Sequence, residues 1–228
     1  MKRLLLLFSL IVLLAACEND AYDAGDGALS YMRADFVEAR TDASARFVSI
    51  VTDDDEHLVV LPSFACKWAE RPDTVYRALF YYNKVEALDG SVCAQPIAAS
   101  PVLTPKIRNS ADVEEAPVAD PVTLVSAWRS RNGKYINMEL SIKTGNPDDE
   151  NIKHVLGLLY EGADEKDTGG RRINLILTHN RMGLPEYYSV TAFVSIPVND
   201  IPGGLSGGDE ISVRVNTYGG MVTKTFSF

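Results

Sequence analysis

Residues 187–198 are YYSVTAFVSIPV, a stretch in which apolar side chains alternate with polar or small ones. The apolar positions at this spacing are Tyr188, Val190, Ala192, Val194 and Ile196. Successive side chains of a β-strand point to opposite faces, so a spacing of two places these residues on one face. The stretch therefore predicts a strand that turns one side toward a hydrophobic core.

Strand-like stretches separated by turn signals fill the rest of the second half of the chain. Asn132 and Gly133 supply the pair of positive-φ residues that a two-residue hairpin turn requires, and Gly219 with Gly220 marks another turn. The further predicted strands of this half are 122–128, 135–142, 154–160, 172–179, 210–218 and 222–228. Seven or so short strands of this kind predict an immunoglobulin-like β-sandwich over residues 122–228.

The first half predicts a smaller β domain over residues 29–107. Its predicted strands are 29–39, 45–51, 57–61, 77–83 and 92–97. The second and third are joined by an acidic turn, residues 53–56, which predicts a hairpin with a solvated tip. Strands at this spacing indicate a small barrel or sandwich. Because no amphipathic helix of three turns is evident after the N-terminal segment, the predicted fold class is all-β.

Residues 108–121, RNSADVEEAPVADP, separate the two halves. They contain two prolines and several acidic residues but no aromatic residue, a composition typical of an interdomain linker. We therefore expect the domain boundary to lie in this segment.

The N-terminus has the order of a secretory signal peptide, with Lys2 and Arg3 followed by an apolar run over 4–16. As a helix this run would cover about 20 Å at ~1.5 Å per residue, less than the roughly 30 Å of a bilayer core. Its end, LAAC at 14–17, resembles the lipobox of bacterial lipoproteins, in which the cysteine is acylated. We expect a signal peptide at 1–16 and lipidation of Cys17, with an ordinary signal peptide as the alternative.

The next residues, 17–28, are acidic and contain glycine, with too little apolar surface to fold, so we expect a solvated tether. Their acidity loosely resembles the signal that sends some Bacteroidetes lipoproteins to the outside of the outer membrane. The expected location is the outer membrane, with the protein facing the periplasm or displayed on the cell surface. Acyl chains on Cys17 would hold it to the membrane.

The charge balance argues against nucleic acid as a partner. The chain has 22 Lys and Arg residues against 31 Asp and Glu residues, and loss of Lys2 and Arg3 with the signal peptide leaves 20 against 31. Over 17–107 the balance is eight basic against fifteen acidic residues. Such a surface lacks the positive groove that follows the phosphates in single-strand binders. We therefore expect no binding of nucleic acid, even by an OB-like module.

Two cysteines, Cys66 and Cys93, remain once Cys17 is acylated. In a compartment where disulfides persist, an even remainder favours a bridge between them, which would close a 28-residue loop. The alternative is a pair of buried free thiols that pack as small apolar side chains. Spacing alone does not establish the geometry that a disulfide requires.

Motifs of catalytic and cofactor sites are absent, among them GxSxG, HExxH, GxGxxG, a Walker loop and a CxxC pair. His57, His154 and His179 lie far apart in the sequence, each near the end of a predicted strand, which favours structural or surface positions. The acidic turn lacks the ligand spacing and the glycine of an EF-hand loop. We therefore expect a non-enzymatic protein with no catalytic residue, no metal and no cofactor.

Aromatic residues are the remaining candidates for a binding surface, and four are close in the sequence: Trp68, Tyr76, Tyr81 and Tyr82. Exposed Trp and Tyr side chains form binding faces in OB-like barrels and at protein interfaces. The alternative is core packing, which strand alternation makes the default for one residue of the Tyr81 and Tyr82 pair. Trp68, in an irregular stretch, is the stronger candidate.

Several stretches resemble the NigD-like lipoproteins of Bacteroidetes. They are the lipobox, the acidic turn before HLVVLPS (57–63), RALFYYN (77–83), DPVTLVSAW (120–128) and LTHNRMGLPEYYSVTAFVSIPV (177–198). The resemblance covers nearly all of the mature chain, and it implies an N-terminal OB-like barrel followed by a C-terminal β-sandwich. The family has no established activity, and its name, taken from a bacteriocin gene cluster, suggests an immunity role. It gives no support to the disulfide.

Three functions are compatible with the sequence. The leading hypothesis is a non-enzymatic envelope protein that binds a protein or a glycan. The second, immunity or self-protection against a secreted bacteriocin, rests on the resemblance. The third and weakest is a hydrolase of envelope polymers, which a deep cleft with two converging carboxylates would support.

Overall fold

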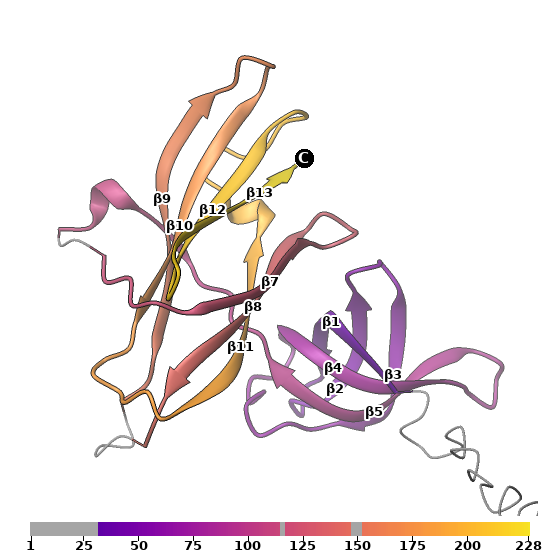
Figure 1. The fold of residues 1–228 in the computed structure, drawn as a ribbon. Coiled ribbons are helices and arrows are strands. Elements are labelled where there is room, and N and C mark those ends of the chain that lie inside the picture. The colour runs from indigo at the N-terminus through magenta and orange to yellow at the C-terminus, as the bar shows by residue number, and fades with distance from the viewer. Residues whose placement is uncertain (1–31, 115–116, 147–151) are drawn as a thin grey trace, which may run out of the picture.

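Strands make up nearly all the regular structure of the computed structural model, which describes residues 32–114, 117–146 and 152–228. They form two bodies, a closed barrel followed by a two-sheet sandwich (Figure 1). In these ranges the helical elements are two 3₁₀ turns, η1 (Ser110–Asp112) and η2 (Val198–Asp200), neither long enough to cross a membrane. The predicted signal peptide 1–16, Cys17 and the tether 17–28 lie outside the described residues.

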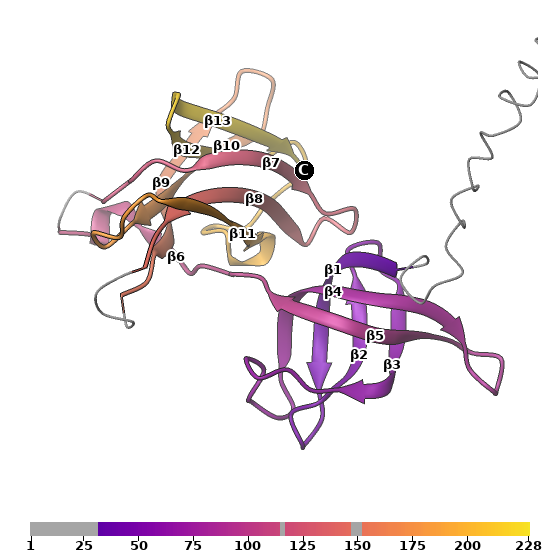
Figure 2. The ribbon, with the colours of Figure 1, turned by 60° about the horizontal axis from the view of Figure 1, so that its bottom comes forward.

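The barrel closes a five-stranded sheet on itself. Its strands are β1 (Met32–Thr41), β2 (Phe47–Thr52), β3 (His57–Phe64), β4 (Val75–Glu86) and β5 (Val92–Pro101). Their order is β1-β2-β3-β5-β4, with β4 returning to β1 and with one parallel pair, β3 with β5 (Figure 2). Alternate side chains point inward, so Phe47, Phe80 and Tyr82 are fully buried in the interior.

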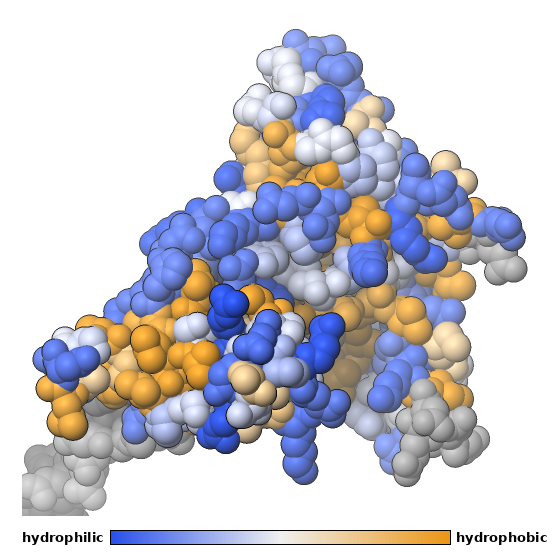
Figure 3. All heavy atoms as spheres, turned by 180° about the vertical axis from the view of Figure 1, so that it is seen from behind, coloured by the Kyte–Doolittle hydropathy of each residue, from blue (hydrophilic) through white to orange (hydrophobic). Residues whose placement is uncertain are grey.

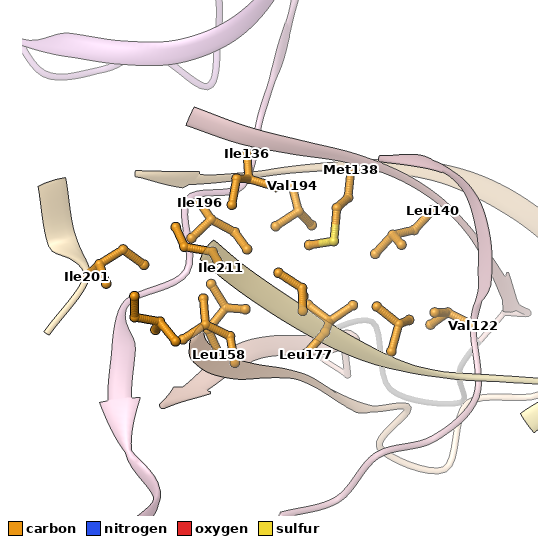
Figure 4. Packing of buried hydrophobic residues seen from close by; sticks show 14 of the residues in the cluster. Val122, Ile136, Met138, Leu140, Leu158, Leu177, Val194, Ile196, Ile201 and Ile211 are labelled. Carbon is orange, nitrogen blue, oxygen red and sulfur yellow. The ribbon is translucent and has the colours of Figure 1, made fainter. Parts of the chain in front are cut away.

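The sandwich consists of a five-stranded and a three-stranded sheet. The larger has the order β13-β12-β10-β9-β6, from β6 (Ile107–Asn109), β9 (Val155–Glu165), β10 (Arg171–Asn180), β12 (Glu210–Thr217) and β13 (Gly220–Ser227). The smaller has the order β11-β8-β7, from β7 (Thr123–Arg129), β8 (Tyr135–Thr144) and β11 (Tyr188–Pro197). Between them Met138, Leu140 and Val194 of the smaller sheet point toward Leu158 and Leu177 of the larger (Figure 4).

The all-β prediction, an OB-like barrel followed by a β-sandwich, is confirmed. The predicted hairpins also form, since β2 pairs with β3, β7 with β8, β9 with β10 and β12 with β13. The larger sheet adds two parallel pairs, β10 with β12 and β6 with β9, which a local alternation pattern does not indicate.

The segment 108–121, expected as a linker, contributes to the sandwich. β6 begins at Ile107 and pairs with β9, and Ala119 forms a bridge with His179. The Asp120 N–H donates to the carbonyl oxygen of His179 at 2.7 Å. Residues 107–109 and 118–120 therefore belong to the sheet, where β9 and β10 supply the backbone partners that a free linker would lack.

A buried cation joins the barrel to the sandwich. Arg77 of β4 is 8% exposed, and its Nη2 donates to Asp53 Oδ2 at 2.7 Å and to Asn137 Oδ1 at 3.1 Å. Its Nε donates to Ser195 Oγ at 3.1 Å, and its guanidinium carbon lies 3.8 Å from the ring centroid of Tyr135. Asn137, Ser195 and Tyr135 belong to the sandwich, so this one side chain bonds both bodies.

The acidic turn 53–56 contacts the sandwich, whereas the sequence predicted a solvated tip. The carbonyl oxygen of Asp53 accepts from Asn132 N–H at 2.9 Å, and Asp54 lies 3.5 Å from the guanidinium of Arg131. The carboxylates of Asp54 and Asp55 thus face Arg131 and Asn132 of the β7–β8 turn, whereas the Glu56 carboxylate pairs with cations of the barrel. The opposite charge of those partners stabilises an acidic cluster that the sequence alone presents as unpaired.

Candidate functional site at the end of the sandwich

The loop 181–187, between β10 and β11, shapes the end of the sandwich away from the barrel (Figures 1 and 2). Met182 and Gly183 have positive φ angles of 57° and 79°, and Leu184 N–H donates to Arg181 O at 3.1 Å, which closes a tight turn. The side chain of Asn180 accepts from Met182 N–H at 2.8 Å. Because Leu184 is buried, the turn is anchored to the sandwich and holds its outer residues in place.

Two tyrosines are exposed where this loop enters β11. Tyr187 is 81% exposed and Tyr188 is 52% exposed, and Val190 on the same strand is exposed as well. The loop lies close to Gly145, where an added Cβ would come within 2.9 Å of the Tyr187 ring. Exposed aromatic residues on an ordered backbone supply large contact area at low entropic cost, and they are enriched in protein interfaces. We refer to residues 187–191 as the tyrosine edge.

The outer side of β11 is a free strand edge at these residues. Beyond them, Leu103 covers the strand, because its backbone donates to Phe193 O at 3.0 Å and accepts from Ser195 N–H at 2.8 Å. Alternate residues direct their N–H and C=O groups to the same side, so Ser189 and Thr191 also direct theirs outward. Within the described ranges no strand pairs with that side of 188–191. An extended peptide can therefore add to the sheet there.

Two histidines form a hydrogen-bonded chain at the same end. His179 is 3% exposed, with its Nδ1 3.1 Å from the carbonyl oxygen of Asp120 and its Nε2 3.0 Å from Nδ1 of His154. A carbonyl oxygen only accepts, so His179 Nδ1 donates and its Nε2 accepts from His154 Nδ1–H. Burial lowers the pKa of both histidines below the ordinary value, which keeps both rings neutral near neutral pH.

This arrangement leaves Nε2 of His154 as an acceptor. The atom is buried and has no hydrogen-bond partner among the described residues. The ring borders a hollow of about 610 Å³ that Asn146, Lys153 and Leu184 also line. A second hollow of about 250 Å³ shares Asn146 and Leu184 with it and extends to Tyr187. The linings mix polar residues such as Asn146 and Lys153 with apolar ones such as Leu184, which suits a small group that carries both kinds of surface.

The carboxylates near these hollows are already engaged. Glu186 Oε1 lies 2.5 Å from Arg181 Nη1 and accepts from Tyr218 Oη–H at 3.0 Å. Asp120 Oδ2 accepts from Arg181 N–H at 2.7 Å. In the part of the chain that the structure describes, no group of three or more His, Cys, Asp or Glu side chains is placed to hold a metal ion. The arrangement supplies hydrogen-bonding and apolar contacts, which suits binding.

The aromatic residues expected at a binding surface lie elsewhere. Trp68 and Tyr76 pack against the barrel core with ring centroids 5.5 Å apart, and Trp68 Nε1 donates to Ala99 O at 3.1 Å. Tyr82 is fully buried and donates to Asp35 Oδ2 at 2.7 Å. The core-packing alternative therefore holds for Tyr82, because a small barrel needs large side chains to fill it, whereas Trp68 and Tyr76 are half-buried against the core and their role in binding stays a prediction. Tyr81 is half-buried.

The disulfide expected between Cys66 and Cys93 is not formed, and both are free thiols. Cys93 pairs with Val85 and Val59 near the start of β5, whereas the Cys66 Sγ lies 4.0 Å from the carbonyl oxygen of Ala99. Residues 93 and 99 are six positions apart on one strand, about 20 Å at ~3.3 Å per residue. That separation is far beyond the reach of an S–S bond.

The three histidines follow two patterns. His57 is exposed at the start of β3, as the sequence predicts, but His154 and His179 are brought together by the β9–β10 hairpin, which pairs His179 with Leu156. The register of that predicted hairpin is the signal that could have located this pair. The tyrosine edge was not among the predicted binding surfaces, because strand alternation does not show which edge of a sheet stays free.

Comparison with known proteins places the chain in a family. The family model of the NigD-like C-terminal beta sandwich domain matches residues 106–228. A search of curated proteins finds no match. Among solved structures, a NigD-like immunity protein from Bacteroides caccae is 23% identical with a TM-score of 0.64, covering 84% of this chain and 91% of its own.

Two further solved structures share the two-domain arrangement. A protein described as toxin-related from Parabacteroides distasonis is 17% identical with a TM-score of 0.63, covering 86% of this chain and 93% of its own. A protein described as a lipoprotein from Bacteroides fragilis is 13% identical with a TM-score of 0.56, and the match covers 86% of this chain and 96% of that protein. At these identities the likeness concerns the fold alone. The family-model match over more than half of the sequence shows that the chain belongs to the NigD-like family.

Proposed function

We propose that this chain is a lipid-anchored, non-enzymatic protein of the bacterial outer membrane that binds a partner at the tyrosine edge. The proposed anchor is Cys17, and the partner is a protein or a glycan, with a protein segment in extended conformation as the better fit. The lipobox-like sequence and the fold shared with a protein described as a lipoprotein support the anchor.

The observation that carries this proposal is the free edge of β11 beside two exposed tyrosines. An added strand of the partner would form main-chain hydrogen bonds with Ser189 and Thr191. The exposed ring of Tyr187 would pack against side chains of that strand. Asp120 and Glu186, held by Arg181, are better placed to fix the loop than to act as an acid and a base, which supports a binding role over hydrolysis.

A photo-crosslinking residue in place of Tyr187, in the acylated protein in intact cells, tests the proposal. We expect a discrete adduct with one partner. The matched control is the same residue in place of Val75, which is 55% exposed in the barrel and gives no adduct of that size. Equal labelling at the two positions, or none at Tyr187, would contradict the proposal.

A second variant tests strand addition. Thr191→Pro removes an outward N–H, so we expect loss of the Tyr187 adduct while the unfolding midpoint stays close to that of the parent. Tyr188→Ala, made in the protein that carries the crosslinker at position 187, should weaken binding of either kind of partner. If Thr191→Pro leaves the adduct unchanged and Tyr188→Ala abolishes it, the partner binds by side-chain stacking, as a glycan would.

Immunity against a secreted bacteriocin is a second candidate, favoured by the fold shared with a protein named as an immunity protein. Deletion of the gene would then raise sensitivity to a toxin of the same bacterium. Unchanged sensitivity to every toxin that the strain and its neighbours secrete would remove this candidate.

A further inference from the structure

An apolar face lies on the outside of the barrel, over β3, β4 and β5. Val59 and Leu61 of β3 are exposed, and the register places Val59 beside Cys93 and Cys93 beside Val85. A shallow hollow of about 540 Å³ lies here, lined by Leu61 and Val85 among others. Figure 3 shows apolar side chains gathered on the barrel in this view. A monomeric soluble protein rarely leaves such a continuous patch uncovered.

The β4–β5 turn extends this face with a single projecting leucine. Leu88 has a relative exposure of 110%, so its side chain touches almost nothing in the protein. The turn satisfies its own backbone, since Ala87 N–H donates to Ser91 O at 2.7 Å and Gly90 N–H to Ala87 O at 3.0 Å. Segments near an apolar phase gain from internally paired backbone groups, and the turn supplies two such pairs.

The chain that precedes the barrel joins it beside this face. Met32, the first residue of β1, pairs with Asn83 of β4, and Asn83 pairs with Gln95 of β5, which lines the hollow. Fourteen residues lie between Cys17 and Met32, and that length spans at most about 50 Å when fully extended. Acyl chains on Cys17 would therefore hold the face within reach of the bilayer surface.

We infer that this apolar face rests on the bilayer that carries Cys17, with Leu88 at the boundary between headgroups and acyl chains. The inference rests on the lipid anchor of the proposed function. Glu86 and Asp89 flank the leucine, so the face suits zwitterionic headgroups and is repelled by anionic ones. Binding by the face alone would be weak, and the anchor supplies the local concentration that makes it effective.

Tryptophan placed at the turn reports the contact. The tryptophan fluorescence of Leu88→Trp in the full mature chain is compared with that of Met221→Trp. In each case the emission of the parent protein is subtracted, which removes the contribution of Trp68 and Trp128. The chain is held on phosphatidylcholine vesicles through an N-terminal histidine tag and a nickel-chelating lipid, which makes attachment independent of acylation. We expect the added emission of the Leu88→Trp variant to shift to shorter wavelength and to be quenched by acyl-brominated lipid, whereas that of the Met221→Trp variant stays unquenched.

The outcomes separate this inference from the proposed anchor. If tagged Leu88→Trp is vesicle-bound but unquenched, the inference is overturned and the anchor is unaffected. A blue shift that grows with protein concentration without lipid would assign the face to a second copy of the chain and would also overturn it. If the acylated protein from cells fails to partition into vesicles, the anchor fails, whatever the tagged protein shows. Leu61→Ser with Leu88→Ser should lose the contact and fold normally.

Discussion

The guanidinium carbon of Arg77 in the barrel lies 3.8 Å from the ring centroid of Tyr135 in the sandwich. The same guanidinium is 2.7 Å from Asp53 Oδ2, so a cation, a carboxylate and an aromatic ring meet where the two domains join. Removal of one partner from such a group leaves the other charge buried and unpaired.

Arg77→Met is therefore expected to destabilise the protein by about 3 kcal/mol or more in urea-induced unfolding. Arg131→Ala removes a largely exposed partner of Asp54 and is the control, with an expected cost of at most about 1 kcal/mol. Adding Asp53→Asn to Arg77→Met should recover part of the loss, because the orphaned carboxylate is then neutral. Equal costs for Arg77→Met and Arg131→Ala would contradict a buried junction.

The histidine pair predicts a pH dependence of stability. The pKa values of His154 and His179 in the folded protein lie below the unfolded value of about 6.5. As the pH falls, the unfolded chain takes up protons first, so stability is complete above pH 6.5 and decreases as the pH falls below it. In the double variant His154→Gln with His179→Gln, the unfolding midpoint should decrease less steeply as the pH falls below 6.5. His57→Gln, at an exposed position, should leave the slope unchanged.

Both cysteines of the barrel are expected to be free in the exported protein. Burial raises the pKa of the Cys66 thiol, so it should react slowly with a thiol reagent in the native state and promptly in urea, as should Cys93. Mass spectrometry without reductant should find two unmodified thiols. A mass that rises on reduction would show that the bridge exists after all.

Gly145 supports the candidate site through its missing side chain. In Gly145→Ala the new Cβ would lie 2.9 Å from the Tyr187 ring and 3.0 Å from Pro185, so the loop must shift. We expect faster amide hydrogen exchange over 181–188, where Tyr187 N–H bonds Thr144 O at 2.9 Å, and a weaker adduct at the tyrosine edge. Gly207→Ala is the control, because nothing lies within 4 Å of a Cβ at that position.

The barrel should not bind single-stranded nucleic acid. Its acidic surplus removes the counterion-release contribution, Tyr82 is fully buried in its core, and Trp68 and Tyr76 pack against that core. Anisotropy titrations with labelled single-stranded DNA and RNA at low salt should show no binding at micromolar protein. Tight binding that weakens with added salt would prove this expectation wrong.

Local sequence patterns predicted the local structure well and the long-range contacts poorly. The alternation in 187–198 places β11 correctly, although Tyr188 and Val190, expected on the core side, are exposed. A hairpin forms where Asn132 and Gly133 predict one, but of the two only Gly133 has a positive φ and the connection spans residues 130–134, so the turn is not the predicted two-residue type. The parallel pairing of β10 with β12 and the docking of Asp53 against Asn137 depend on how distant segments fold together. No local pattern around these positions encodes them.

The Arg77 junction also affects how far the protein can reach. The guanidinium bonds β4 to β8 and β11. The barrel and the sandwich are therefore held at a fixed distance from each other and do not move as two independently tethered domains. The tyrosine edge lies at the end of the sandwich away from the barrel (Figure 1). With the barrel resting on lipid, the distance between the tyrosine edge and the membrane would be set by the joined domains. A longer tether after Cys17 would therefore leave that distance unchanged.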